Sequence, residues 1–417
     1  MQMNSIKDME SIRGHFYISV WITFCLFLFS SCCKEPPPVE PEMQRSVLIY
    51  MAAHNSLGRD RDDYANIEKL KQGFLPANGN IIIYHDAYDA PPRMFRLVKG
   101  ANNLIEEELI AEYSEEDSAD PSVLTRSLLL MRDLFPADDY GLIFWSHGLG
   151  WLPAVEWNKY RMPVNKYEDY ARMGTFYQEQ QMPRTKDCGQ DTGAGSWMNI
   201  HDMADAIPFH LSFLIFDACL MGTIEVAFPF REKVDYMIAS PTEIISEGFP
   251  YHQIMEPLFL PTPDYNRVCN AFFYYYDEHP YGGYWQSATI ALYQLNELSA
   301  FAGLVGSIIE NNRLKLNDFV PSVQSLQCYD RIDPDLFFDL GDFISNMATP
   351  SEYVDFVSSL NRLVPYKRAT EKFFYVPIDS QKFNGIATYV PNGSKEISST
   401  REAYKLTEWN HAVGLVE

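Results

Sequence analysis

Short apolar segments alternate with amphipathic segments between residues 46 and 260. The apolar segments, each of strand length, are 46–53, 80–87, 140–146, 211–219 and 234–240. Two further segments, 121–135 and 198–207, repeat apolar residues at helical spacing. Strands that are apolar on both faces and alternate with helices indicate a parallel sheet covered on both sides. The pattern therefore predicts an α/β domain over residues 46–260.

The pattern changes after residue 260, where helical spacing becomes more frequent. Helices are predicted over 266–278, 298–314, 335–347 and 352–364, and strands over 284–295 and 383–391. Neither an internal repeat nor a clear linker marks the change. We expect a helix-rich α+β region over residues 261–417, either as a second unit or packed on the first domain.

Residues 1–33 have the pattern of an export signal. Basic residues precede the apolar run 16–29, which is short for a membrane span and typical of a signal-peptide core. Small residues lead to Cys32, so the segment is similar to a bacterial lipoprotein signal whose cysteine becomes lipidated. Cys33 is the second choice, and a plain secretory signal is the alternative. The Pro-rich stretch 34–45 is then expected to be an extended spacer next to the membrane.

Composition and charge narrow the classes of protein and of partner. Of the 417 residues, 47% are hydrophobic, which is enough for a sizeable core. The formal net charge is −23, and the acidic residues are spread along the chain. Phosphate binding requires clustered Lys and Arg, so nucleic acid is excluded as a partner. A basic substrate is compatible with this charge, although surface solubility explains it more simply.

The cysteines outside the predicted signal follow no metal-binding pattern. They are Cys188, Cys219, Cys269 and Cys328. Their spacing is wide, without a CxxC pair or a Cys/His arrangement, so we predict neither a metal site nor a disulfide framework from them. A reduced cysteine in an exported protein is usually buried or used in chemistry.

Two of the predicted strands end in reactive residues. One runs into His147 and Gly148, and another ends on Asp217 and Cys219. Active sites of α/β sheets form beyond the carboxyl ends of the strands, so these two ends are expected at one edge. A thiolate is a nucleophile, and an imidazole beside it accepts or relays the proton. Each residue alone is commonly structural, whereas the pair at two strand ends is a far more specific signal.

The backbone next to these residues adds to the predicted chemistry. Gly148 leaves room for a substrate, and its N–H is a candidate, together with that of Cys219, to stabilise an oxyanion. The residues after Cys219 are predicted to begin a helix, whose N-terminus would favour the thiolate. Taken alone, Asp217 is also explained as the N-cap of that helix.

These blocks resemble the caspase, legumain and gingipain superfamily of cysteine peptidases, and within it the clostripain family. The segments that carry the resemblance are LIYMAAHNSL, WSHGLGW, FDACLMG with EVAF, and YMIASPTEIISEGFPY. The likeness covers residues 46–260, and the His and Cys blocks are its specific part. It implies a caspase-like, mostly parallel sheet flanked by helices, with Cys219 as nucleophile and His147 as proton-transfer partner.

The resemblance also implies a substrate pocket. In clostripain-like enzymes the Asp two positions before the Cys pairs with Arg or Lys at P1, and that position is Asp217 here. The loop that holds a second acid differs from the family pattern; Glu247 is the candidate, with Glu243 as the alternative. The chemistry requires no cofactor. Calcium dependence is known in the family, but the chain has no Asp-rich calcium loop, so no metal ligands are assigned.

Three hypotheses follow for the function. The first is an exported cysteine endopeptidase, lipid-anchored to a bacterial cell membrane with the outer membrane favoured, that cleaves proteins or peptides after Arg or Lys. The second is a non-catalytic surface lipoprotein that uses a peptidase-like fold to bind peptide or glycan through its many aromatic residues. The third keeps the enzyme but places Asn or Asp at P1; Asp217 argues against Asp because like charges would meet.

Overall fold

The computed structural model describes residues 45–74, 79–157, 159–160, 184, 196–321, 324–391 and 396–417. The predicted signal peptide over residues 1–33, with Cys32 and Cys33, lies outside these residues, as does the spacer except Arg45. Within the described part of the chain, no helix is long and apolar enough to cross a membrane.

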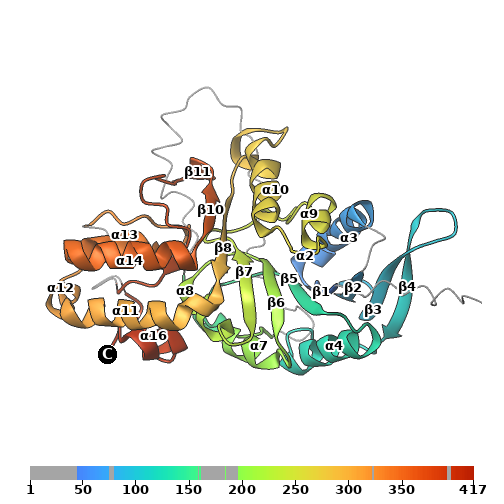
Figure 1. Cartoon of the computed structure of the whole chain (residues 1–417), viewed down its shortest axis with the longest axis horizontal. Coiled ribbons are helices and arrows are strands. Elements are labelled where there is room, and N and C mark those ends of the chain that lie inside the picture. The colour runs from blue at the N-terminus through green and yellow to red at the C-terminus, as the bar shows by residue number, and fades with distance from the viewer. Residues whose placement is uncertain are drawn as a thin grey trace, which may run out of the picture. The chain divides into compact units, whose positions relative to one another are not determined.

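A nine-stranded sheet runs through the fold (Figure 1). Its strands are β1 (Arg45–Ala52), β2 (Gly79–Asp86), β3 (Arg93–Lys99), β4 (Ile105–Glu112), β5 (Asp139–Trp145), β6 (Leu211–Asp217), β7 (Val234–Ala239), β8 (Thr289–Gln294) and β10 (Tyr366–Ala369). Their order is β10-β8-β7-β6-β5-β1-β2-β3-β4. The five central strands, from β7 to β2, are parallel, and the pairs at both edges are antiparallel. The predicted α/β fold with a mostly parallel sheet is confirmed.

Helices cover both faces of this sheet. They are α2 (Ser56–Arg59), α3 (Asp62–Gly73), α4 (Pro121–Leu134), α5 (Ala154–Trp157), α7 (Ile200–Ala206), α8 (Ile224–Ala227), α9 (Tyr251–Leu258), α10 (Tyr265–Asp277), α11 (Leu298–Asn311), α12 (Arg313–Asn317), α13 (Leu340–Met347), α14 (Pro350–Leu363), α15 (Ser398–Lys405) and α16 (Glu408–Val413). In Figure 1, α3, α9 and α10 lie above the sheet, and α4 and α7 lie below it.

The alternation of side chains along β1 divides the core into two clusters. Leu48 and Tyr50 point to the face covered by α4, α7 and the C-terminal helices. Val47 and Ile49 point to the opposite face, covered by α3, α9 and α10. All four are fully buried. A parallel strand buried on both sides has to be continuously apolar, which explains why the sequence pattern located these strands correctly.

The sequence pattern did not predict β3 and β4, the two strands at one edge of the sheet. Strand β3 pairs antiparallel with β2, and β4 pairs with β3. Strand β4 reads IEEELIAE, and none of its residues is fully buried. Charged residues on an edge strand prevent pairing with other chains, but they also remove the apolar alternation by which a strand is recognised.

Two predicted C-terminal elements are shorter than expected. The helix predicted over 335–347 begins only at Leu340, because Oδ1 of Asp339 caps it by accepting the N–H of Asp342 at 2.8 Å. The residues before it form the two-residue strand β9 (Phe338–Asp339). The strand predicted over 383–391 is reduced to β13 (Ala387–Thr388), which pairs with β9.

The C-terminal region is continuous with the N-terminal sheet. Strands β8 and β10 extend the sheet beyond β7. Residues 43–417 form one compact unit. The boundary expected near residue 260 therefore does not coincide with a boundary between compact units, because the antiparallel edge of the sheet is built from the chain that follows it.

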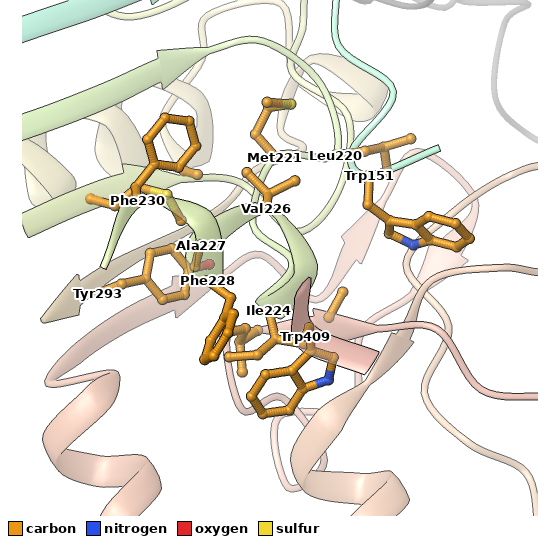
Figure 2. Close-up of a cluster of buried hydrophobic side chains, with 14 of the residues drawn as sticks. Trp151, Leu220, Met221, Ile224, Val226, Ala227, Phe228, Phe230, Tyr293 and Trp409 are labelled. Atoms are coloured by element: carbon orange, nitrogen blue, oxygen red, sulfur yellow. The ribbon is translucent and has the colours of Figure 1, made fainter. Parts of the chain in front are cut away.

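The segment after Cys219 is packed into the C-terminal region (Figure 2). The ring of Phe228 meets that of Trp409 edge to face, with centroids 5.4 Å apart. Trp151, which follows the His147 loop, meets Tyr404 in the same way at 5.0 Å. The loops that carry His147 and Cys219 therefore both rest on side chains from the last fifteen residues of the chain.

Candidate active site

The register of the sheet brings His147 and Cys219 to the same edge. Strands β5 and β6 pair in parallel with Trp145 opposite Asp217, so each candidate lies two residues beyond a matched pair. Gly148 confirms the close approach: a Cβ added to it would lie 2.4 Å from the carbonyl oxygen and 3.0 Å from the nitrogen of Cys219. Only glycine permits this contact. The predicted meeting of the two strand ends is therefore observed.

A small hydrogen-bond cluster holds His147 from the side of β1. Oγ of Ser56 lies 3.0 Å from Nε2 of His147. Nδ2 of Asn55 donates to the carbonyl of Ala52 at 2.9 Å, and Oγ of Ser146 donates to the same carbonyl at 3.0 Å. The Oδ1 of Asn55 also accepts the N–H of Leu57 in α2 at 2.9 Å. This cluster fixes α2, and with it Ser56, against the end of β5.

Cys219 lies in a tight turn rather than at the start of a helix. Leu220, the next residue, has a φ of 60°, and its N–H donates to the carbonyl of Thr242 at 2.9 Å. Helix α8 begins only at Ile224, has four residues, and is capped by Thr223. The predicted helix N-terminus beside the thiol is therefore wrong, because the left-handed backbone at Leu220 cannot continue into a helix.

The sulfur of Cys219 has a backbone donor from another segment. The N–H of Ile244 lies 3.1 Å from Sγ of Cys219, and Cys219 is fully buried. Hydrogen bonding to a charged form stabilises that form. The amide of Ile244 is therefore available to a thiolate, while the carbonyl of the same residue, 3.6 Å from Sγ, accepts the neutral thiol.

Asp217 is fully buried beneath the loop that follows β7. Its Oδ2 accepts the hydroxyl of Tyr251 at 2.8 Å and the N–H of Phe249 at 3.3 Å. Burial, followed by the charge of Asp217, raises the pKa of Tyr251 well above its usual value, so this phenol is a neutral donor. The interpretation of Asp217 as an N-cap is wrong, because no helix begins next to it.

Glu247 and Glu243, the two candidates for a second acid, have different surroundings. The carboxylate of Glu247 is partly exposed and accepts the hydroxyl of Tyr275 at 2.7 Å. The carboxylate of Glu243 is buried and forms a two-pronged ion pair with the guanidinium of Arg331, one contact of which is 3.1 Å. Glu243 therefore joins the loop to the C-terminal region, and Glu247 is the better placed of the two to meet a substrate.

Two basic residues that the sequence analysis did not single out also reach this loop. Nζ of Lys69 donates to the carbonyl of Glu247 at 3.0 Å. Burial lowers the pKa of Lys69, while the charges of Glu247 and Asp217 oppose that shift, so this cation lies in the field of both acids. The carbonyl of Arg184 accepts the N–H of Ser246 at 2.8 Å. The guanidinium of Arg184 forms an ion pair with Asp62 at 3.2 Å.

A pocket opens beside His147. Its lining includes Ser146, His147 and Gly148 from the strand end, and Trp151 and Met221 from the packed loops. The lining combines apolar surface with the backbone of the His147 turn, as expected for a pocket that receives part of a peptide.

A thiol and an imidazole at adjacent parallel strand ends can act as the nucleophile and the base of nucleophilic acyl transfer. The structure adds a backbone donor to the sulfur, a hydroxyl on the imidazole, and a buried carboxylate two residues before the thiol. Fold and site together define the class of α/β cysteine peptidases.

Comparison with known proteins identifies the family within this class. The model of the clostripain family matches residues 49–167 and 171–413. The chain belongs to the clostripain family.

Individual relatives agree with this assignment. Clostripain from Hathewaya histolytica is 24% identical over 245 residues, which are 51% of this chain and 41% of that protein. The chain thus matches about two-fifths of the length of this curated relative. The structure of an inactive zymogen C11 protease from Parabacteroides distasonis is 30% identical, with a TM-score of 0.72 over 90% of this chain and 99% of that one. A secreted C11 cysteine protease from Bacteroides thetaiotaomicron, in complex with an irreversible peptide inhibitor, is 25% identical, with a TM-score of 0.70 over 89% and 99%.

Proposed function

We propose that this chain is an exported cysteine endopeptidase that uses Cys219 and His147 as its catalytic dyad and cleaves after Arg or Lys. The observation that supports it most directly is the contact of Gly148 with the backbone of Cys219, since it holds the two loops together at the end of parallel strands. The peptide inhibitor bound to the relative from Bacteroides thetaiotaomicron is in keeping with a peptide substrate.

The chemistry of this proposal proceeds in two halves. The Cys219 thiolate attacks the scissile carbonyl carbon, and the oxyanion is stabilised by the N–H groups of Gly148 and Cys219. His147, protonated by the thiol, gives its proton to the leaving amine, and a thioester remains on Cys219. Water, deprotonated by His147, then attacks the thioester and releases the new carboxyl end.

The preference for a basic P1 residue rests on Asp217 and Glu247. Oδ2 of Asp217 accepts hydrogen bonds from two neutral donors, Tyr251 and the Phe249 amide, which orient the carboxylate. A buried carboxylate attracts a guanidinium or an ammonium strongly. Glu247, which is partly exposed, would contact the same cation from the pocket rim, where solvent weakens the interaction.

We further propose that the protein is exported and anchored by a lipid on Cys32. The sequence pattern supports it, and one structural relative is described as secreted. Cys32→Ala should move the protein from the membrane fraction to the soluble fraction, because acyl chains supply the anchoring. Continued lipid labelling in that variant would point to Cys33, and no labelling of the wild-type protein would leave the plain secretory signal.

The test of the catalytic proposal is a cleavage profile. The purified protein is given fluorogenic peptides that differ only at P1 (Arg, Lys, Asn, Asp or a neutral residue), with and without Ca²⁺, beside Cys219→Ala. We expect cleavage of the Arg and Lys peptides by the wild type alone, and labelling of Cys219 by a thiol-reactive peptide. If the protein binds peptides but neither cleaves them nor is labelled, the binding-only hypothesis replaces this one.

A further inference from the structure

Three side chains with metal-binding atoms meet where β1 and β2 end. A ring nitrogen of His54 and one carboxylate oxygen each of Asp86 and Glu115 all lie within 4.8 Å of one another. Nδ1 of His54 is 3.0 Å from Oε1 of Glu115. Ligands held tetrahedrally at about 2.1 Å from an ion are roughly 3.4 Å apart. Atoms that lie within 4.8 Å of one another reach this spacing by shifts of roughly an ångström. The side chain of Glu115 is 64% exposed and can supply that movement.

The backbone around this cluster is held in place without a metal. The N–H of Ala53 donates to the carbonyl of Asp86 at 3.0 Å, which ties His54 to the end of β2. On the other side, Glu116 forms an ion pair with Arg126 at 2.8 Å, which fixes the residue next to Glu115. A site whose ligands come from restrained segments loses little entropy on binding an ion.

The charges around the cluster favour a cation. Asp86 is fully buried and shares the cluster with a second carboxylate, that of Glu115. Burial, followed by the negative charges of Asp86 and Glu116, raises the pKa of Tyr50 well above its usual value, although Arg126 opposes this effect. The direction of this shift agrees with the negative charges that the cluster places at the ends of β1 and β2.

We propose that His54, Asp86 and Glu115 bind a divalent transition-metal ion of the Zn²⁺ class. One imidazole nitrogen with two carboxylates suits such an ion, whereas Ca²⁺ prefers six to eight oxygen ligands. The described residues contain a second cluster, Cys328, Asp330 and Asp335. There the carboxylate of Asp330 already accepts three backbone N–H groups, from Ile332, Leu336 and Phe337, at 2.6–3.1 Å. Its role in shaping the loop makes it the weaker candidate.

This site is separate from the catalytic dyad but close to it. His54 and His147 line the same cavity, and Ser56, which contacts His147, is two residues after His54. Zn²⁺ also binds thiols, so inhibition of peptidase activity by Zn²⁺ would not identify the site. Binding therefore has to be measured on protein that lacks Cys219.

The test is titration of the full chain carrying Cys219→Ala with Zn²⁺ by calorimetry, and with Co²⁺ by absorption spectroscopy. Adding His54→Gln or Glu115→Gln should weaken Zn²⁺ binding by roughly tenfold or more. The control is Glu112→Gln, an exposed acid three residues before Glu115, which should leave the affinity unchanged. Bound Co²⁺ should show visible bands without a thiolate charge-transfer band, because the ligands are nitrogen and oxygen.

Other outcomes would overturn the proposal. They are equal Zn²⁺ affinity in all of these proteins, a thiolate band with Co²⁺, or tighter binding of Ca²⁺ than of Zn²⁺. Glu115 is exposed, so Glu115→Gln tests the site even if a change at the buried Asp86 prevents folding. The measurement uses protein without the nucleophile, so its result is independent of the proposed peptidase function.

Discussion

The hydroxyl of Ser56 lies 3.0 Å from Nε2 of His147, and it links the first helical turn after β1 to the imidazole at the end of β5. The contact engages one nitrogen of the imidazole that exchanges a proton with Cys219 in the proposed mechanism. A hydroxyl in this place fixes the orientation of the ring and favours one tautomer. Ser56 is therefore a positioning residue, since it acts on substrate only through His147.

Ser56→Ala should lower kcat by about tenfold to a hundredfold and leave KM nearly unchanged, because a misplaced imidazole impairs proton transfer more than binding. Ser56→Thr keeps the hydroxyl and should retain more activity. The measurement is kcat and KM from pH 5 to 9 for both variants, with Ser307→Ala on α11 as control. A purely structural role would instead lower the amount of active enzyme while the pH profile of kcat stays the same.

Gly148→Ala should abolish most of the activity while the protein still folds. The added Cβ would meet the carbonyl oxygen of Cys219 at 2.4 Å, so the two loops have to move apart. Overpacking of this kind costs about 1–3 kcal/mol of unfolding free energy. Gly303→Ala is the matched control, because nothing lies within 4 Å of a Cβ there, and it should stabilise α11 by up to about 1 kcal/mol. Urea unfolding and kcat/KM together check both expectations. Wild-type kinetics in Gly148→Ala would show that the loops do not need this contact.

Cys219→Ala and His147→Ala should each remove turnover and leave the fold intact. The two residues act as a unit, so the double variant should be little worse than either single one. Active-site-normalised kcat/KM of the three proteins is the measurement. Substantial activity in His147→Ala would mean that another group accepts the proton of the thiol.

The approach of His147 and Cys219 could be predicted from the sequence because it depends on rules of the fold. The continuously apolar segments identify the strands in the sequence. Parallel strands place their carboxyl ends at one edge of the sheet, so His147 and Cys219, which follow two of these strands, were expected to lie close together. The partners of these residues could not be predicted. Ser56 begins α2, Ile244 lies in the connection between β7 and α9, and Tyr251 begins α9. Which of these segments lies over which strand end is decided by tertiary packing.

Tertiary contacts also explain where the sequence predictions failed, at the helix start expected after Cys219 and at the edge strand β4. The residues FDACLMG alone do not distinguish a helix start from a turn with a left-handed Leu220. That turn is held by hydrogen bonds to the carbonyls of Ser240 and Thr242, in the segment that follows β7. The alternation that identifies strands is likewise absent from the charged edge strand β4, whose pairing with β3 is a tertiary contact.

Asp217→Asn should weaken cleavage after Arg and Lys selectively. Loss of the charge that faces the substrate cation costs about 2–5 kcal/mol, which is at least roughly thirtyfold in kcat/KM. Peptides with a neutral P1 residue should be affected little, and Glu247→Gln should act in the same direction but more weakly. Asp235→Asn, an exposed acid at the start of β7, is the control. An equal loss for every P1 residue would show that Asp217 supports the Cys219 turn through Tyr251 rather than selecting substrate.

Glu225 links the helix after Cys219 to the C-terminal region and should make stability depend on pH. Its Oε1 accepts the hydroxyl of Thr388 at 2.7 Å, the N–H of Tyr389 at 3.0 Å and the hydroxyl of Tyr404 at 3.2 Å. Burial raises the pKa of this carboxyl from 4.5 to about 7, although these hydrogen bonds oppose the shift. The folded protein therefore keeps a proton that the unfolded chain releases between these values.

The direction in which pH changes the stability follows from the linkage between proton binding and folding. The contribution of Glu225 is fully present below pH 4.5 and is lost as the pH rises towards 7, because only the unfolded state gains by releasing the proton. The shift corresponds to a loss on the order of 3 kcal/mol across that window. Glu225→Gln, which stays neutral, should flatten the fall in Tm between pH 5 and pH 7.5. The control is Glu232→Gln, an exposed residue in the turn before β7, which should leave that fall unchanged. Asp339, whose pKa burial raises to about 6, adds a similar slope that remains in the variant. If Tm falls equally in wild type and Glu225→Gln, Glu225 is already ionised in the folded protein, and its three hydrogen bonds stabilise the charge.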